Sequence, residues 1–191
     1  MRKVVFQMMT TLNGRLDDPD AWVTTVDDEQ FKEIDRQYER FDTLLVGKPT
    51  YIEMQAYWST AGDAPDASAV IKSMARKMNA YKKYVISDAQ TTDTLNWNNT
   101  QQVAAHSDGD IIRFINELKD QQGGDIHLAG GARLAQSIVR LGLVDEYHFF
   151  VYPVVSKGAS WFDRIKEKRE MKLLAVHSYG DIVGLYYAPK G

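Results

Sequence analysis

The sequence predicts one α/β domain whose mixed, mainly parallel sheet is flanked by helices and ends in antiparallel strands. Three observations predict this class. Short apolar runs alternate with segments of helical periodicity over most of the chain. Two of the runs end in glycine just before a helix begins. The last third carries three strand-like runs without a helix-length segment between them, which favours antiparallel pairing.

The first half of the chain supplies two strands and three helices. The run 3–9 reads as a central strand, and the pair Asn13-Gly14 after it is a strong turn signal. A helix of about four turns follows, with Asp27 and Gln30 placed as a capping box. Its apolar positions, at helical spacing, are Phe31, Ile34, Tyr38 and Phe41. A buried strand is predicted at 43–47, a short helix from Pro49, a surface segment at 62–69 and a further helix at 70–83.

The second half of the chain continues the alternation of strands and helices as far as Gly142 and then contains only strand-like runs. A strand at 84–86 and a helix from Asp108 are followed by an apolar strand at 126–129. That strand runs into Gly130-Gly131 and a helix that Gly142 ends as the residue just after its C-cap. The final strand-like runs are 147–155, 172–176 and 183–188. We find no internal repeat or linker, so the prediction is a single domain over residues 1–191.

Composition excludes several classes of function. The chain has no cysteine, which removes disulfides, thiolate nucleophiles and Cys-based metal sites. A net charge of −3 with interspersed signs argues against nucleic acid as a partner. No apolar run approaches the roughly 18 residues that span a bilayer, and the N-terminal run is too short for a signal peptide, so we expect no membrane segment and a cytoplasmic protein. Four histidines without ligand spacing indicate no metal site: His106, His127, His148 and His177.

The two glycine-bearing strand ends are the strongest signal for chemistry. A helix start offers free backbone N–H groups to an anion, and glycine lets a phosphate approach them closely. Each glycine alone is compatible with ordinary turn chemistry, but two such places suit a dinucleotide. Known motifs do not fit. A P-loop needs glycine where Asp42 stands and Ser or Thr where Pro49 stands, and the segment after Gly130 lacks the Gly-x-Gly-x-x-Gly spacing.

Three segments carry a resemblance: Thr11-Leu12-Asn13-Gly14, the stretch from Asp42 to Tyr51, and Leu128-Ala129-Gly130-Gly131 through Asp145-Glu146. They resemble the dihydrofolate reductase-like family that includes the reductase domain of the bifunctional riboflavin-biosynthesis deaminase/reductase and its stand-alone bacterial relatives. The resemblance covers nearly the whole chain. It implies an NADPH-dependent reductase that transfers hydride to a pterin, a pyrimidine or a similar conjugated heterocycle. The alternative is a nucleotide-binding protein of the same fold without reductase turnover.

The resemblance also implies which residues bind the cofactor. Gly47, Lys48 and Thr50 would meet phosphate at one helix start, and Ser87 would approach the adenosine ribose or its phosphate. The pyrophosphate would lie on the second helix start. The complete predicted set is Asn13, Gly14, Gly47, Lys48, Thr50, Ser87, Gly130, Gly131, Ala132, Arg133 and Leu134.

The choice between NADPH and NADH depends on two charged residues. The family more often has Arg at the position of Lys48 and a basic residue at the position of Asp88. An acidic Asp88 could face a ribose hydroxyl and favour NADH, whereas Lys48 can pair with a 2′-phosphate. We expect Lys48 to decide the preference for NADPH. Asn13 and Ala159 also depart from the family pattern, in loops that bear on the nicotinamide pocket.

A proton donor is the part of the site that the sequence leaves open. Asp27 and Asp35 are candidates on the first predicted helix, beside Asp28 and Glu33. The structural alternatives are a helix cap for Asp27 and solvated surface charges for Glu33 and Asp35. Finally, members of the family often pair, and the apolar run 147–155 is predicted as the edge of a homodimer.

Overall fold

The computed structural model describes residues 1–23, 25, 27–87 and 95–190. They form one eight-stranded sheet with the strand order β4-β3-β2-β5-β1-β6-β8-β7. The strands are β1 (Val4–Thr11), β2 (Phe41–Gly47), β3 (Lys82–Ser87), β4 (Thr100–Ala104), β5 (Asp125–Leu128), β6 (Glu146–Tyr152), β7 (Met171–Tyr179) and β8 (Ile182–Pro189).

The first six strands in chain order pair in parallel with one another, and the last two pair antiparallel. β4, β3, β2, β5, β1 and β6 pair in parallel, whereas β8 pairs antiparallel with both β6 and β7. This confirms the predicted class: a mainly parallel α/β sheet with an antiparallel C-terminal end.

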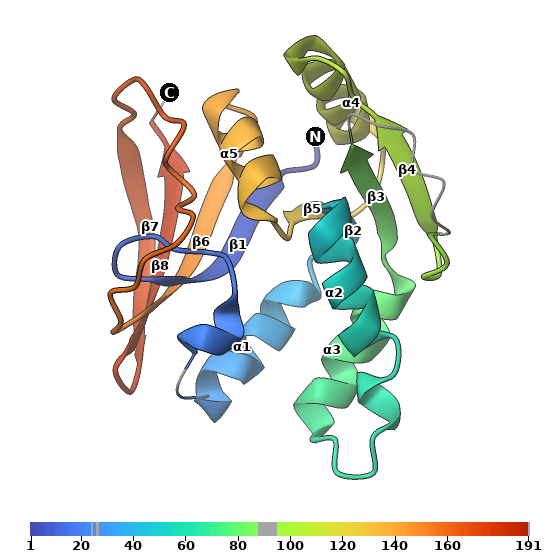
Figure 1. The fold of residues 1–191 in the computed structure, drawn as a ribbon, viewed down its shortest axis with the longest axis vertical. Helices are drawn as coiled ribbons and strands as arrows, with labels where there is room; N and C mark the ends of the chain where they lie inside the picture. The colour runs from blue at the N-terminus through green and yellow to red at the C-terminus, as the bar shows by residue number, and fades with distance from the viewer. Residues whose placement is uncertain (24, 26, 88–94, 191) are drawn as a thin grey trace.

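Helices cover both faces of the sheet (Figure 1). The face that carries Phe6, Leu45 and Leu128 packs against α4 and α5, and the face that carries Val5, Leu44 and Phe150 packs against α1, α2 and α3. The helices are α1 (Asp28–Tyr38), α2 (Lys48–Trp58), α3 (Ala69–Ala80), α4 (Asp108–Asp120) and α5 (Ala132–Arg140), with two 3-10 turns, η1 (Pro19–Ala21) and η2 (Ala61–Asp63). No helix in the described part of the chain is long and apolar enough to cross a membrane.

Several predicted boundaries are confirmed by local chemistry. Pro49 lies in the first turn of α2, where its missing N–H costs nothing. Gly142 follows the end of α5 at φ +73°, and its N–H donates to the carbonyl of Val139, as expected of a glycine that ends a helix. The start of α4 at Asp108 is also as predicted, with the Ser107 side chain as its cap.

Other predictions are wrong, each for a definable reason. The first helix ends at Tyr38, because Phe41 pairs with Asp125 as the first residue of β2. The third helix stops at Ala80, so Lys83 belongs to β3. The strand β4 was not predicted, because its residues Thr-Gln-Gln-Val-Ala are mostly polar and it lies at the edge of the sheet.

The predicted dimer edge is wrong as well. The run 147–155 begins with β6, which lies between β1 and β8 and pairs with both. Its ladder hydrogen bonds are used on both sides, so it offers no free edge to a second chain. The strand at that end of the sheet is β7.

Candidate nucleotide-binding cleft

The candidate site lies between two neighbouring parallel strands whose onward connections run to opposite sides of the sheet. From β2 the chain continues outward to β3 and β4, whereas from β5, the neighbour of β2, it continues the other way to β6. The connections therefore diverge at the carboxyl ends of β2 and β5. Open α/β sheets bind ligands in the crevice at such a switch point.

The two predicted helix starts meet at this point, near the centre of Figure 1. The Gly47 N–H, at the end of β2, donates to the carbonyl of Gly130 at 3.3 Å. A Cβ built on Gly131 would lie 2.8 Å from Thr50 Oγ1, so the first turn of α2 faces the start of α5. Gly130 and Gly131 have φ angles of +90° and +60°, which favour glycine at both positions. Glycine backbone therefore lies where the two helix starts approach each other.

Neither helix start has a side-chain cap from its N-cap residue. The N-cap residues Gly47 and Gly131 make no side-chain capping hydrogen bond, and neither first turn contains an acidic residue. Their first turns carry Lys48 and Arg133, which are cations at the positive end of a helix dipole. That placement is unfavourable in a free helix and favourable beside a bound anion. The close approach at Gly131, the two helix starts without a side-chain N-cap and the two cations fit a pyrophosphate.

The remaining predicted cofactor residues are distributed around this cleft. Ala132 and Leu134 belong to the first turn of α5, where Leu134 is buried against the sheet and Arg133 is exposed. Ser87 ends β3, the neighbour of β2, at the same edge of the sheet. Asp88 lies outside the described residues.

Asn13 and Gly14 follow β1 at this edge and are tied to a distant segment. Asn13 Oδ1 accepts from the Thr11 hydroxyl and from the N–H of Ser156, while its Nδ2 donates to the Ser156 carbonyl. Gly14 has φ +79°, and a Cβ there would lie 2.5 Å from the Phe162 ring. Both residues hold the loop after β1 against the segment after β6, so any contact with a cofactor would be made by a loop that is already ordered.

The two candidate proton donors have structural partners. Asp27 Oδ1 accepts from the Gln30 N–H at 2.9 Å and caps α1, as the structural alternative predicts. The Lys77 ammonium of α3 lies 2.8 Å from Asp35 Oδ1. Asp35 therefore faces α3, away from the cleft between α2 and α5. Asp27 and Asp35 stay unproven as proton donors.

Sequence analysis missed the residue that α1 buries most deeply. Gln30 has no exposed surface, whereas Phe31 is only half-buried. Only half of the predicted capping box forms, because the Gln30 side chain turns inward and its Oε1 accepts from the Tyr152 hydroxyl at 3.0 Å. The spacing Gln30, Ile34 and Gln37 was the available signal, but two glutamines in a helical stripe read as its solvent side.

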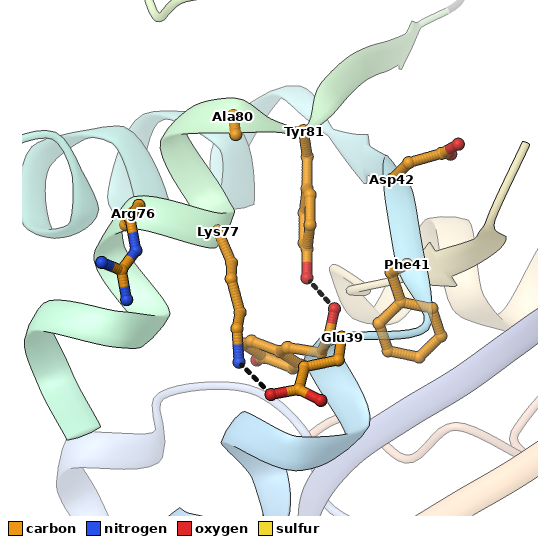
Figure 2. Close-up of a pocket in the computed structure, with 8 residues that line it drawn as sticks. Glu39, Phe41, Asp42, Arg76, Lys77, Ala80 and Tyr81 are labelled. Atoms are coloured by element: carbon orange, nitrogen blue, oxygen red, sulfur yellow. Dashed lines mark hydrogen bonds and ion pairs between the residues drawn. The ribbon is translucent and has the colours of Figure 1, made fainter.

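An open groove elsewhere on the surface is separate from this cleft. It has a volume of about 450 Å³ and lies between the end of α1, the end of α3 and the start of β2. Figure 2 shows Lys77 directed at Glu39, the Tyr81 ring reaching from the end of α3 toward the end of α1, and Phe41 on β2 beside them. Because it lies at the amino end of β2, the groove is at the opposite end of the strand from Gly47. In the described ranges, no group of three or more His, Asp or Glu side chains could hold a metal ion.

The mixed sheet and its flanking helices have the dihydrofolate reductase-like α/β fold. The family model of the RibD C-terminal domain matches residues 2–183. The chain therefore belongs to the RibD C-terminal domain family, a family of reductase-type domains. The uncharacterized protein YyaP of Bacillus subtilis (strain 168) is 26% identical over 191 residues, with 97% of this chain and 94% of YyaP covered.

Solved structures share the fold at low identity. A putative riboflavin biosynthesis protein from Shewanella sp. PV-4 matches over the whole of both chains, with a TM-score of 0.69 and 18% identity. The deaminase/5-amino-6-(5-phosphoribosylamino)uracil reductase of Thermotoga maritima matches with a TM-score of 0.65 and 11% identity, over 99% of this chain and 57% of that one. Dihydrofolate reductase from Enterococcus faecalis, complexed with NADP(H), matches with a TM-score of 0.59 and 12% identity, over 99% and 97% of the two chains.

Proposed function

We propose that this protein is a reductase that transfers a hydride from NADPH to a flat, conjugated heterocycle of pterin or pyrimidine type. The observation that carries the proposal is the pair of uncapped glycine helix starts that face each other across the switch point of the sheet. Membership of the RibD C-terminal domain family and a fold shared with an NADP(H)-bound reductase support it.

In this proposal the cofactor lies along the carboxyl edge of the parallel strands. The N–H groups at the starts of α2 and α5 hold its phosphates, with Gly47, Thr50 and residues Gly130 to Leu134 around them. Lys48 pairs with a 2′-phosphate, and Ser87 lies toward the adenosine ribose. Asn13 and Gly14 keep the loop after β1 in place beside the nicotinamide. Bound NADPH supplies the hydride, and water or a side chain supplies the proton.

The second candidate is a nucleotide-binding protein of this fold without turnover. It is favoured by one observation: the carboxylates of Asp27 and Asp35 are already engaged with the Gln30 N–H and Lys77. A reductase could still take its proton from water, so the two candidates differ in turnover and not in binding.

Two measurements separate these candidates. A thermal shift with NADPH, NADH, folates and pyrimidine riboflavin precursors tests binding, because a ligand of the native state raises the melting temperature. Loss of reduced-nicotinamide absorbance in the presence of the same heterocycles tests turnover. Binding with turnover is the expected result. NADPH binding without turnover on any of the heterocycles would establish the second candidate, and no nucleotide binding would overturn both.

A further inference from the structure

The two helices of the nucleotide cleft are anchored to the fold in different ways. α5 buries five of its nine residues, among them Leu134, Ile138 and Val139. Of the eleven residues of α2, all of which the structure describes, only Tyr51 is buried. Tyr51 lies about one helical turn after Lys48. One side chain therefore fixes the end of α2 at which the phosphates are proposed to bind.

The Tyr51 hydroxyl is held by the stretch of chain that leads into β4. It accepts from the N–H of Trp97 at 2.9 Å and from the Thr100 hydroxyl at 3.3 Å, and the Tyr51 and Trp97 ring centroids lie 6.0 Å apart. A second hydrogen bond between the same two segments joins Gln55 Nε2 to Asn96 Oδ1 at 3.0 Å. The position of α2 therefore depends on where this stretch of chain lies.

Lys83, in β3, holds the same stretch of chain in place. Its side chain has no exposed surface, and its ammonium donates to three backbone carbonyls, those of Tyr81 at 2.8 Å, Asn98 at 2.9 Å and Asn79 at 3.3 Å. The ammonium also lies 4.3 Å from the centroid of the Trp97 ring, within the range of a cation–π contact. Three N–H groups therefore meet three carbonyls, which belong to the end of α3 and to the chain before β4.

No carboxylate among the described residues balances this charge. Burial, without a contribution from a neighbouring charge, lowers the pKa of Lys83 to about 8. Loss of the proton would leave two N–H donors for three carbonyls and would remove the positive charge from the face of the Trp97 ring. The other ionisable side chains on the surrounding elements, each with a described contact of its own, are Tyr51 on α2, Lys77 on α3, and Tyr81 and Lys82 just before Lys83.

We propose that Tyr51 and Lys83 are positioning residues for nucleotide binding, because together they fix the start of α2 through the chain before β4. The role rests on the proposed function and adds its regulation by pH: the charged ammonium of Lys83 keeps the helix start in place, and loss of its proton weakens nucleotide binding. Both side chains are buried, so neither touches the cofactor itself. Packed and hydrogen-bonded contacts of this kind can couple two sites, and ordinary coupling changes an affinity by about fivefold or more.

A matched pair of variants, Tyr51→Phe and Tyr81→Phe, tests the role of Tyr51. Both tyrosines belong to the same buried cluster, with 1% and 5% of their surface exposed, and each hydroxyl bonds to a backbone group. Both variants should lower the melting temperature. Only Tyr51→Phe should also lower the affinity for NADH and NADPH, by about fivefold in a fluorescence titration at pH 7. Equal nucleotide affinities in the two variants would overturn the positioning role of Tyr51.

The pH profile of nucleotide binding tests the role of Lys83. NADH is the ligand, because it lacks the titratable 2′-phosphate of NADPH. Between pH 7 and pH 9.5 the affinity of the wild type should fall about fivefold, whereas Lys83→Met, with a side chain of similar shape and no charge, should bind at the weaker level throughout. Any other group that titrates in this range, Lys48 included, would change both profiles alike. The difference between the two profiles therefore isolates Lys83.

Urea unfolding separates positioning from a general loss of stability. The folded protein releases the Lys83 proton near pH 8, whereas the unfolded chain keeps it up to the ordinary pKa of 10.5. The unfolded state binds more protons in this range, so this group makes the fold more stable as the pH rises. Relative to Lys83→Met, the wild type should therefore gain stability over the same range in which its NADH affinity falls.

The outcomes distinguish this proposal from the proposed function. Parallel profiles of NADH affinity in the wild type and Lys83→Met would overturn the role of Lys83 and leave the proposed function intact. A wild type that binds neither NADH nor NADPH at any pH would overturn the proposed function, and the positioning role with it.

Discussion

The two ends of the parallel strands are built on opposite electrostatic principles. At the amino ends the charges neutralise one another. Glu146, the first residue of β6, binds Lys3 at 2.6 Å, Arg40 at 2.8 Å and His148 at 3.0 Å, and Arg40 also binds Asp125. At the carboxyl ends of β2 and β5, the glycine helix starts have no side-chain N-cap hydrogen bond and no acidic residue in the first turn. One end pairs its charges within the fold, and the other carries the helix starts of the proposed phosphate site.

Even within the carboxyl edge, the helix starts differ. The helix α4 follows β4 much as α5 follows β5, yet α4 is capped by the Ser107 side chain and has Asp108 and Asp110 in its first turn. The helix α5 has a glycine cap and Arg133 instead. The start of each helix is the positive end of its dipole. In α4, a side-chain cap and two aspartates compensate this partial charge, whereas α5 has neither in its first turn. In the proposed function, a bound phosphate supplies the negative charge that the start of α5 lacks.

A buried lysine at the amino end of β3 also has all its described partners within the fold. Lys83 has no exposed surface, and its ammonium donates to the backbone carbonyls of Tyr81 at 2.8 Å and Asn98 at 2.9 Å. It also lies 4.3 Å from the Trp97 ring centroid. Burial lowers the pKa of Lys83 to about 8. Its donors are therefore used to join α3, β3 and the chain before β4.

The largest effect on binding is expected from Gly131→Ala. A Cβ at this position obstructs the approach of a phosphate to the helix start, and the loss of one charge-assisted hydrogen bond, about 1.5–3 kcal/mol, lowers affinity ten- to a hundredfold. The effect should be similar for NADPH and NADH in isothermal titration. Gly180→Ala is the matched control, because Gly180 has φ +57° against +60° for Gly131 and lies in the β7–β8 turn. Equal losses of nucleotide affinity in the two variants would contradict the cleft.

At the opposite end of the strands, Glu146→Gln should affect stability and not binding. Removing one member of a buried ion-pair group typically costs 3–5 kcal/mol, and we expect about 2 kcal/mol here because Lys3 and Arg40 are partly exposed. The hydrogen bond with His148, assisted by Arg40 and Lys3, holds the pKa of Glu146 well below its usual 4.5. The carboxylate therefore stabilises the fold above about pH 4.5, and this contribution is lost as the pH falls.

Urea unfolding at pH 7 and at pH 3.5 checks this prediction. The difference in unfolding free energy between wild type and Glu146→Gln should be large at neutral pH and should shrink in acid. If the difference in unfolding free energy were the same at both pH values, the carboxylate of Glu146 would not stabilise the fold through its charge. If the variant lost nucleotide binding, the charges around Glu146 at the amino ends of the strands would not be purely structural.

A somewhat smaller effect is expected from Lys48→Ala, which tests cofactor preference. A charge-assisted hydrogen bond to the 2′-phosphate contributes about 1.5 kcal/mol or more, so the variant should lose at least tenfold in affinity for NADPH and little for NADH. Asp88→Arg should enlarge the preference. Arg133→Ala separates the two helix starts, because a cation at the pyrophosphate should matter equally for both cofactors. If titration finds NADPH and NADH equal in the wild type, the assignment of Lys48 is wrong.

Ser107→Ala is the counterpart of these variants at the capped start of α4. Loss of the cap should lower the unfolding free energy by about 1 kcal/mol, as measured in urea, with unchanged nucleotide affinity. A change in affinity would mean that α4 takes part in the site.

Substitutions on the edge strand β7 should change neither the unfolding free energy nor the nucleotide affinity. The homodimer stays a prediction, and β7 is now its expected interface, since Leu173, Leu174 and Val176 are 51%, 46% and 53% exposed on this edge strand. Light scattering should give about twice 21.7 kDa for the wild type and the monomer mass for Leu174→Lys. A wild-type monomer across micromolar concentrations would exclude the dimer.

Much of the fold was predictable because its signals are local. The glycines after β2 and β5, the helix from Asp108 and the end of α5 at Gly142 follow from residue size, periodicity and capping. The glycine pair in particular is unusual enough to point to an anion before any contact is known. The family resemblance in the same segments agreed with the family model that matches residues 2–183.

The sequence by itself thus determined the fold class, the cleft glycines and the order of most elements, because each depends on neighbours within a few turns of the chain. Only the tertiary structure decided that β4 pairs at the edge, that β6 is interior, and that Gln30 turns inward to Tyr152. The partners in these cases are not neighbours in the sequence; Gln30 and Tyr152, for example, are 122 positions apart. Whether a polar side chain is buried depends on such a hydrogen-bond partner, and the periodicity of a single helix does not predict a distant partner.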